Sequence, residues 1–77
     1  MRNSVAAQEP IIVCIEKRRL LQEFAHAVSE FNRINSAQVA AVMRGEDFPF
    51  QMELADALDR KEQAKYAILA HQEQHGC

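Results

Sequence analysis

The stretch Arg44-Gly45-Glu46-Asp47-Phe48-Pro49-Phe50 decides the fold of this chain. Beyond Pro10, the only other strong helix breaker is Gly76, so the stretch separates two long uninterrupted runs. Gly45 is suited to end one helix in the left-handed conformation, and Pro49 is suited to the first position of the next helix. The sequence therefore predicts an all-α fold in which two long antiparallel helices form a helical hairpin.

The predicted hairpin fills most of the chain, so we expect a single domain. We expect a flexible N-terminal tail over residues 1–9 and the hairpin over residues 10–77, with helices at about 10–44 and 49–75 and a turn at 45–48. With 77 residues the chain is near the lower limit for a domain that folds alone. A core of this size rarely contributes more than about 3–5 kcal/mol without a disulfide, a metal or a partner chain.

The first predicted helix carries three apolar rows, each repeating every seven residues. The Leu21 row contains Cys14, Leu21, Val28 and Val42, and the polar Asn35 occupies one of its positions. The Phe31 row contains Phe24 and Phe31, and the polar Lys17 and Gln38 occupy two of its positions. The Ile34 row contains Val13, Leu20, Ala27, Ile34 and Ala41. A two-stranded seam uses two of the seven positions, so a single hairpin would leave one row in water. We therefore expect a homodimer in which two hairpins form a four-helix bundle or coiled coil.

The second predicted helix presents one inward row to the first. This row contains Phe50, Leu54, Ala57, Lys61, Ala64, Ile68, His71 and His75, with Leu58 and Leu69 beside it. Met52, Tyr66 and Leu69 fall outside the inward row, so they add apolar surface that a protein partner could cover.

The open end of the hairpin gathers residues that can bind a metal. Because the helices are antiparallel, the end of the second helix lies near Cys14 at the start of the first. His71 and His75 are one turn apart on one helix face, and two thiolates would complete a tetrahedral zinc site. Three interpretations remain open at this point. They are a zinc site formed by Cys14, His71, His75 and Cys77, a Cys14–Cys77 disulfide, and a passive, solvated tail.

The chain resembles a set of short bacterial proteins of uncharacterised function. The matching motifs are Cys14-Ile15-Glu16-Lys17, Gly45-Glu46-Asp47-Phe48-Pro49 and the C-terminal His71-Gln72-Glu73-Gln74-His75-Gly76-Cys77. The resemblance covers residues 11–77. It implies a helical hairpin and gives weight to the cysteine and histidine positions, and it brings no known activity.

Composition argues against several classes of function. Nine Lys and Arg against eleven Asp and Glu give a net charge of −2, without the basic face by which proteins bind nucleic acids. No apolar stretch is longer than the five residues of 11–15, whereas a helix needs about 20 residues to span a bilayer, so we expect no membrane partner and a cytoplasmic location. A two-helix hairpin offers almost no concave pocket for a preorganised nucleophile and base, so we expect no enzyme activity.

These observations predict a small, self-associating structural or protein-interaction module. The alternative is a small metal-binding or thiol-redox-responsive protein that uses the cluster at the open end, because a bound metal would add stability to a hairpin with little core.

Overall fold

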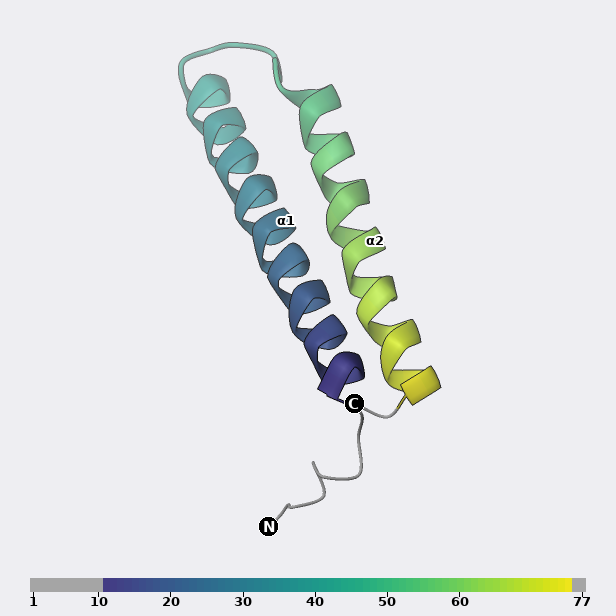
Figure 1. Cartoon of the computed structure of the whole chain (residues 1–77). Coiled ribbons are helices and arrows are strands. Elements are labelled where there is room, and N and C mark those ends of the chain that lie inside the picture. Colours follow the sequence, from purple (N-terminus) through teal and green to yellow (C-terminus); the bar gives the residue numbers. More distant parts are fainter. Residues whose placement is uncertain (1–10, 76–77) are drawn as a thin grey trace.

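The computed structural model describes residues 11–75, with side chains from residue 15 onward. Helix α1 covers Ile11–Met43 and helix α2 covers Gln51–His75. Figure 1 shows the two helices side by side and antiparallel, joined by one loop at the end that we name the loop end; the opposite end is the open end. The molecule measures 56 × 20 × 14 Å, which is a single layer of two helices. The prediction of an all-α helical hairpin is confirmed.

Helix α1 ends in a Schellman motif, which is why the chain reverses direction where it does. Gly45 has a φ of +94°, in the region that glycine enters without steric cost. Its N–H donates to the carbonyl of Val42 at 2.9 Å, and the N–H of Glu46 donates to the carbonyl of Ala41 at 3.0 Å. These are the two bonds that satisfy the last free carbonyls of a helix.

Helix α2 begins at Gln51, whereas the sequence predicted a start at about Pro49. Phe48 has a φ of +52°, so the backbone turns once more in the left-handed region before the helix can begin. The first helical hydrogen bond runs from the N–H of Leu54 to the carbonyl of Phe50 at 2.8 Å. Phe50 is therefore the N-cap residue, and its aromatic side chain cannot cap the helix as Ser or Asp would.

The missing cap comes from the other helix. Gln38 of α1 is only 4% exposed, and its Oε1 accepts the backbone N–H of Phe50 at 2.9 Å. Its Nε2 donates to Oε1 of Gln51 at 3.4 Å. Gln38, a polar residue in an apolar row, thus supplies a hydrogen-bond acceptor to the start of α2 and joins the two helices at the loop end.

The core is thin and lies between the Ile34 row of α1 and the inward row of α2. Its buried members are Ile34, Ala41, Ala57 and Ile68, together with the polar Gln38 and His71. Phe24 and Phe31 are half-buried at its edge. No large side chain in the described part of the chain is fully buried. This packing leaves the Leu21 row at the margin of the helix pair.

Neither helix in the described range reaches the combination of length and apolar character that crossing a membrane requires.

Candidate functional site

One long side of the hairpin exposes apolar side chains from both helices, and we name it the apolar flank. Its members are Leu21, Val28, Val39, Val42, Met43, Phe48, Leu54, Leu58 and Leu69. Leu21 and Val42 share one seven-residue row, and Val42 lines the same hollow as Leu54 of α2. Leu58 follows Leu54 by four residues and Leu69 follows Leu58 by eleven, which keeps all three on one side of α2.

Most side chains of the apolar flank are exposed in the hairpin, and Val28, Val42 and Leu54 are half-buried. Val39 is 51% exposed, Leu69 48%, Leu21 46% and Leu58 43%. Single exposed apolar residues are common on protein surfaces, but a continuous strip along two helices is characteristic of an interaction surface. The Leu21 row is therefore the row that two helices alone fail to cover.

The loop end of the apolar flank contains a hollow of about 260 Å³. It is lined by Asn35, Gln38, Val39, Val42, Met43, Phe48, Gln51 and Leu54. None of these residues is charged, and the polar members carry amides. A hollow of this character accepts an apolar side chain from a neighbouring surface more readily than a charged ligand.

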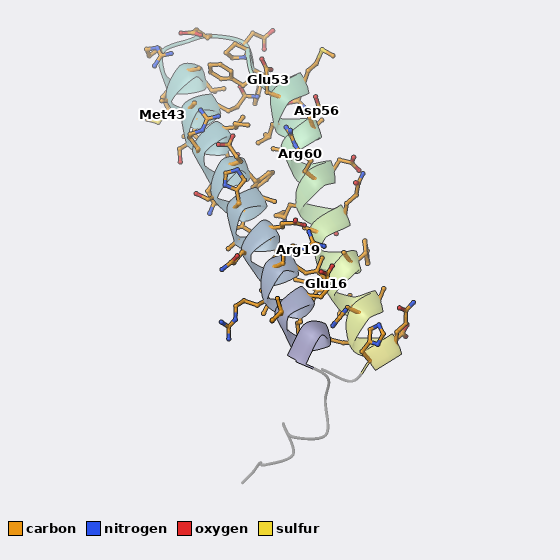
Figure 2. All side chains as sticks on the ribbon, viewed as in Figure 1. Glu16, Arg19, Met43, Glu53, Asp56 and Arg60 are labelled. Atoms are coloured by element: carbon orange, nitrogen blue, oxygen red, sulfur yellow. The ribbon has the colours of Figure 1, made fainter. Side chains whose placement is uncertain are left out.

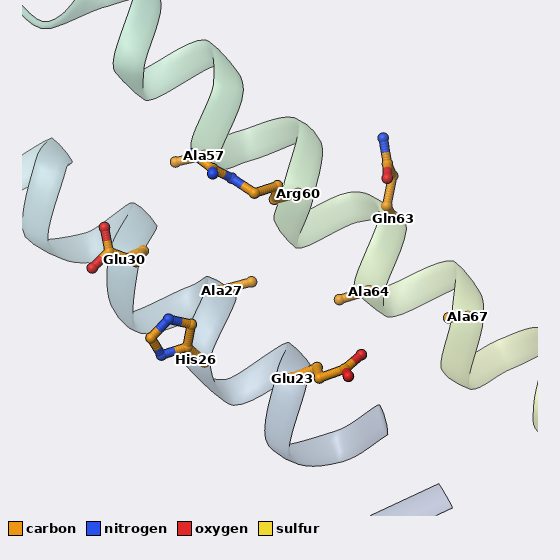
Figure 3. A pocket seen from close by; sticks show the side chains of 9 residues that line it. All are labelled: Glu23, His26, Ala27, Glu30, Ala57, Arg60, Gln63, Ala64 and Ala67. Atoms are coloured by element: carbon orange, nitrogen blue, oxygen red, sulfur yellow. The ribbon is translucent and has the colours of Figure 1, made fainter. Parts of the chain in front are cut away.

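The opposite side of the hairpin, which we name the charged flank, has a different chemistry. A groove of about 410 Å³ lies there, lined by Glu23, His26, Ala27, Glu30, Ala57, Arg60, Gln63, Ala64 and Ala67. Figure 3 shows the methyl groups of Ala27 and Ala64 pointing toward one another across the groove, between longer polar side chains. The alanines allow close approach of the helices, and the polar side chains remain solvated.

The charges of α1 separate the two flanks. Between residues 20 and 43, the titratable residues of α1 are Glu23, His26, Glu30 and Arg33. The first three line the groove of the charged flank, and Arg33 donates to Glu30 at 2.8 Å. On α2, Glu53, Asp56 and Arg60 follow one another along the helix (Figure 2) at spacings of three and four residues, the same side as the groove. The hollow at the loop end of the apolar flank is therefore lined by uncharged residues.

The open end brings His71 and His75 together, as their one-turn spacing predicted. Their ring centroids lie 4.8 Å apart, with the ring planes inclined at 49°. His71 is 8% exposed, and its Nε2 has no hydrogen-bond partner among the described residues. His75 is exposed. A buried nitrogen without a partner is costly, at roughly 1–3 kcal/mol, so the His71 position is unusual for a purely structural residue.

Glu16 of α1 extends toward the same end. Its pKa is lowered chiefly because Arg19 donates hydrogen bonds to its carboxylate, and a charge on His71 would lower it further. Among the described side chains, no three His, Cys, Asp or Glu residues are grouped closely enough to hold a metal ion. The backbone of Cys14 lies in α1, but its side chain and all of Cys77 lie outside the described residues. The structure thus places two of the four expected ligands together.

Two exposed residues of the apolar flank, Val39 and Met43, were not in any of the three rows. The signal that could have identified them is their spacing from Asn35, which they follow by four and eight residues. Asn35 itself is exposed and lines the hollow. We treated Asn35 as an interruption of the Leu21 row. If it is counted as a position of the surface, the predicted interaction surface extends to the loop.

Fold and surface together define a two-helix hairpin with one uncovered apolar side. Comparison of the chain with models of known protein families, with curated proteins and with solved structures found no match.

Proposed function

We propose that this protein is a self-associating helical hairpin with a structural or protein-interaction role, and that a second copy covers the apolar flank. The observation that carries the proposal is the set of partly exposed Leu and Val side chains that both helices contribute to the apolar flank. Burying apolar surface is the dominant favourable term in most protein association. The proposal includes no catalytic step and no contact with nucleic acid or membrane.

The thin core gives a second reason for association. A hairpin in which the largest buried side chains are two isoleucines gains little from burial within one chain. Two hairpins packed through their apolar flanks would share a four-helix core, which is the usual way for long amphipathic helices to bury a wide apolar stripe.

Sedimentation velocity over a hundredfold range of concentration, read together with thermal unfolding, tests this proposal. We expect a dimer whose population and melting temperature both rise with protein concentration, because association stabilises the folded state by mass action. A species that stays monomeric, with a melting temperature independent of concentration, would contradict the proposal.

A second candidate function is metal binding or thiol-redox response at the open end. The unpartnered Nε2 of buried His71 beside the His75 ring favours it, because metal binding would give that nitrogen a partner. The remaining ligands of a zinc site would be Cys14 and Cys77; a Cys14–Cys77 disulfide is the competing arrangement. A reducing cytoplasm, where we propose the protein resides, would keep both as thiols.

Thermal unfolding of chelator-treated, reduced protein with and without one equivalent of Zn²⁺ tests the metal site. We expect Zn²⁺ to raise the melting temperature of the wild type and to have little effect on His71→Ala or His75→Ala. His26→Ala is the matched control, because His26 is an exposed imidazole of the charged flank. Equal melting temperatures with chelator, Zn²⁺, reductant and oxidant would exclude both metal and disulfide.

A further inference from the structure

The last turn of α2 carries both imidazoles of the open end on one face of the helix. His71 and His75 are four residues apart, a spacing at which the side chains of a helix meet, and their ring centroids lie 4.8 Å apart. Two histidines at this spacing on a helix can bind one metal ion together, as they do in helical zinc motifs. The pair is therefore a candidate chelate without any contribution from α1.

The burial of His71 distinguishes this pair from two solvated imidazoles. His71 is 8% exposed, and its Nε2 is buried without a hydrogen-bond partner among the described residues. Such a nitrogen is rare in folded proteins, because it loses the hydrogen bonds that it made in water. Imidazole nitrogens are good ligands of late first-row divalent metals, so a bound ion would supply the missing partner. His75 is exposed and gives an ion access to the pair.

Glu16 of α1 adds negative charge near the pair. The pKa of its carboxyl is lowered chiefly by hydrogen bonds from Arg19, and a charge on the nearby His71 contributes to the same shift. Because electrostatic attraction is mutual, the Glu16 carboxylate also favours positive charge at His71, and a metal ion brings such a charge. Arg19 already binds the carboxylate, so Glu16 supports the ion through its charge and is not counted among the ligands.

The register of the two helices places Cys14 beyond the level of His71. The methyl groups of Ala27 and Ala64 point toward one another across the groove of the charged flank (Figure 3). Seven residues further toward the open end, the same register brings Leu20 to the level of His71. The backbone of Cys14 lies six residues further along α1, which is about 9 Å at 1.5 Å per residue. Because metal–ligand bonds are only about 2.0–2.3 Å long, an ion held by His71 is better placed for His75 than for Cys14.

We propose that His71 and His75 alone chelate one late first-row divalent ion, such as Ni²⁺ or Zn²⁺, with water at the remaining positions. This inference rests on the metal binding proposed above as the second candidate function, and it removes Cys14 and Cys77 from the ligand set. It agrees with the finding that no three His, Cys, Asp or Glu residues are grouped around a common point among the described side chains. An ion that bridges two residues one turn apart holds the last turn of α2 helical, where the final carbonyls have no partner within the helix.

Calorimetric titration of Ni²⁺ into tag-free, chelator-treated and reduced protein tests the ligand set. We expect one ion per chain, and binding at least about tenfold weaker for His71→Ala and for His75→Ala. The double variant Cys14→Ser, Cys77→Ser should keep a dissociation constant within about threefold of the wild type. His26→Ala is the matched control, because His26 is an exposed imidazole of the charged flank.

The outcomes separate the inference from the proposed metal binding. If the wild type binds Ni²⁺ and the cysteine double variant does not, the protein binds metal through a larger ligand set and the two-imidazole chelate is wrong. If the single histidine variants bind as tightly as the wild type, the ion lies elsewhere and the chelate is also wrong. A wild type that binds no Ni²⁺ at all would contradict metal binding at the open end itself.

Hydrogen exchange tests the effect of the ion on the helix. Ni²⁺ should slow exchange of the backbone amides in the last turn of α2, in the wild type and in the cysteine double variant alike, and should leave the amides next to the loop unchanged. Mg²⁺ is the control ion, because it prefers oxygen ligands. Exchange in the last turn that saturating Ni²⁺ does not slow would overturn the proposed clamp on α2.

Discussion

At the scale of single residues, the most informative side chain is Gln38. In the sequence it is a polar interruption of the Phe31 row, yet in the fold it is among the most buried residues, at 4% exposure. Its amide accepts the Phe50 N–H and donates to Gln51, so α2 begins where α1 holds it. A buried amide is tolerated because its hydrogen bonds are made.

Gln38→Met should therefore destabilise the hairpin by about 1–2 kcal/mol. Met has nearly the same length and volume but leaves the Phe50 N–H without its acceptor. Urea unfolding measures the change as a lower midpoint with an unchanged slope. Gln22→Met, at an exposed position of α1, is the control and should be close to neutral. Equal midpoints for the two variants would contradict the capping role of Gln38.

Gly45 gives a second prediction at this scale. A Cβ atom at Gly45 would meet nothing within 4 Å, so only the backbone conformation, with φ at +94°, opposes another residue. We expect Gly45→Ala to cost about 1 kcal/mol, and Gly45→Asn to cost less because Asn tolerates the left-handed region better. The comparison uses thermal or urea unfolding, and an Ala variant as stable as wild type would show that the Schellman motif relaxes without cost.

At the scale of helices, the sequence predicted the two elements well and their junction less well. The breakers Gly45 and Pro49 were sufficient to predict two helices and the end of the first. The start of α2 was missed because Pro49 suits the first helical position, and nothing in the local sequence reveals that Phe48 adopts a positive φ or that the cap comes from a residue twelve positions earlier.

For the candidate surface too, the sequence predicted the general feature but not its details. Counting three rows predicted that one would be uncovered, but periodicity does not specify on which side of α1 the second helix packs. The structure identifies the Leu21 row as the uncovered one and adds Val39 and Met43. At the open end, the spacing of His71 and His75 predicted their proximity, whereas the lack of a partner for His71 Nε2 depends on three-dimensional packing.

Ion pairs along α1 make helix stability depend on pH. Arg33 donates hydrogen bonds to Glu30, which lowers the pKa of the Glu30 carboxyl. A carboxyl with a lower pKa in the folded state binds fewer protons there than in the unfolded state. The contribution of Glu30 to the stability of the fold is therefore complete above the ordinary carboxyl pKa. It is lost as the pH falls from about 5 through the lowered pKa of Glu30.

We expect Glu30→Gln to flatten the loss of stability on acidification. Urea midpoints measured from about pH 6 to pH 3 should fall less for the variant than for wild type, and the difference should shrink in high salt. Glu53→Gln is the control, because Glu53 forms no salt bridge within the described residues. Parallel curves for wild type and Glu30→Gln would show that this exposed pair contributes nothing measurable.

At the scale of the whole molecule, the hairpin is long and thin, and one flank is apolar while the other is charged. A single layer of two helices encloses little volume, so the surface that we propose for association is a side of the molecule and not a cavity. If a second copy covers the apolar flank, as we propose, association would contribute to the stability of the protein and set its overall shape.

The cap that Gln38 supplies also has a consequence for folding kinetics. Because the first turn of α2 depends on a side chain of α1, the two helices should nucleate together at the loop, where the entropy cost of closing the chain is smallest. The hairpin would then form from the loop toward the open end, and the hydrogen-bonded backbone amides next to the loop, such as that of Leu54, would exchange with deuterium last. His71 and its neighbours would unzip first, so the end of the molecule that carries the imidazoles is also the end that opens most often.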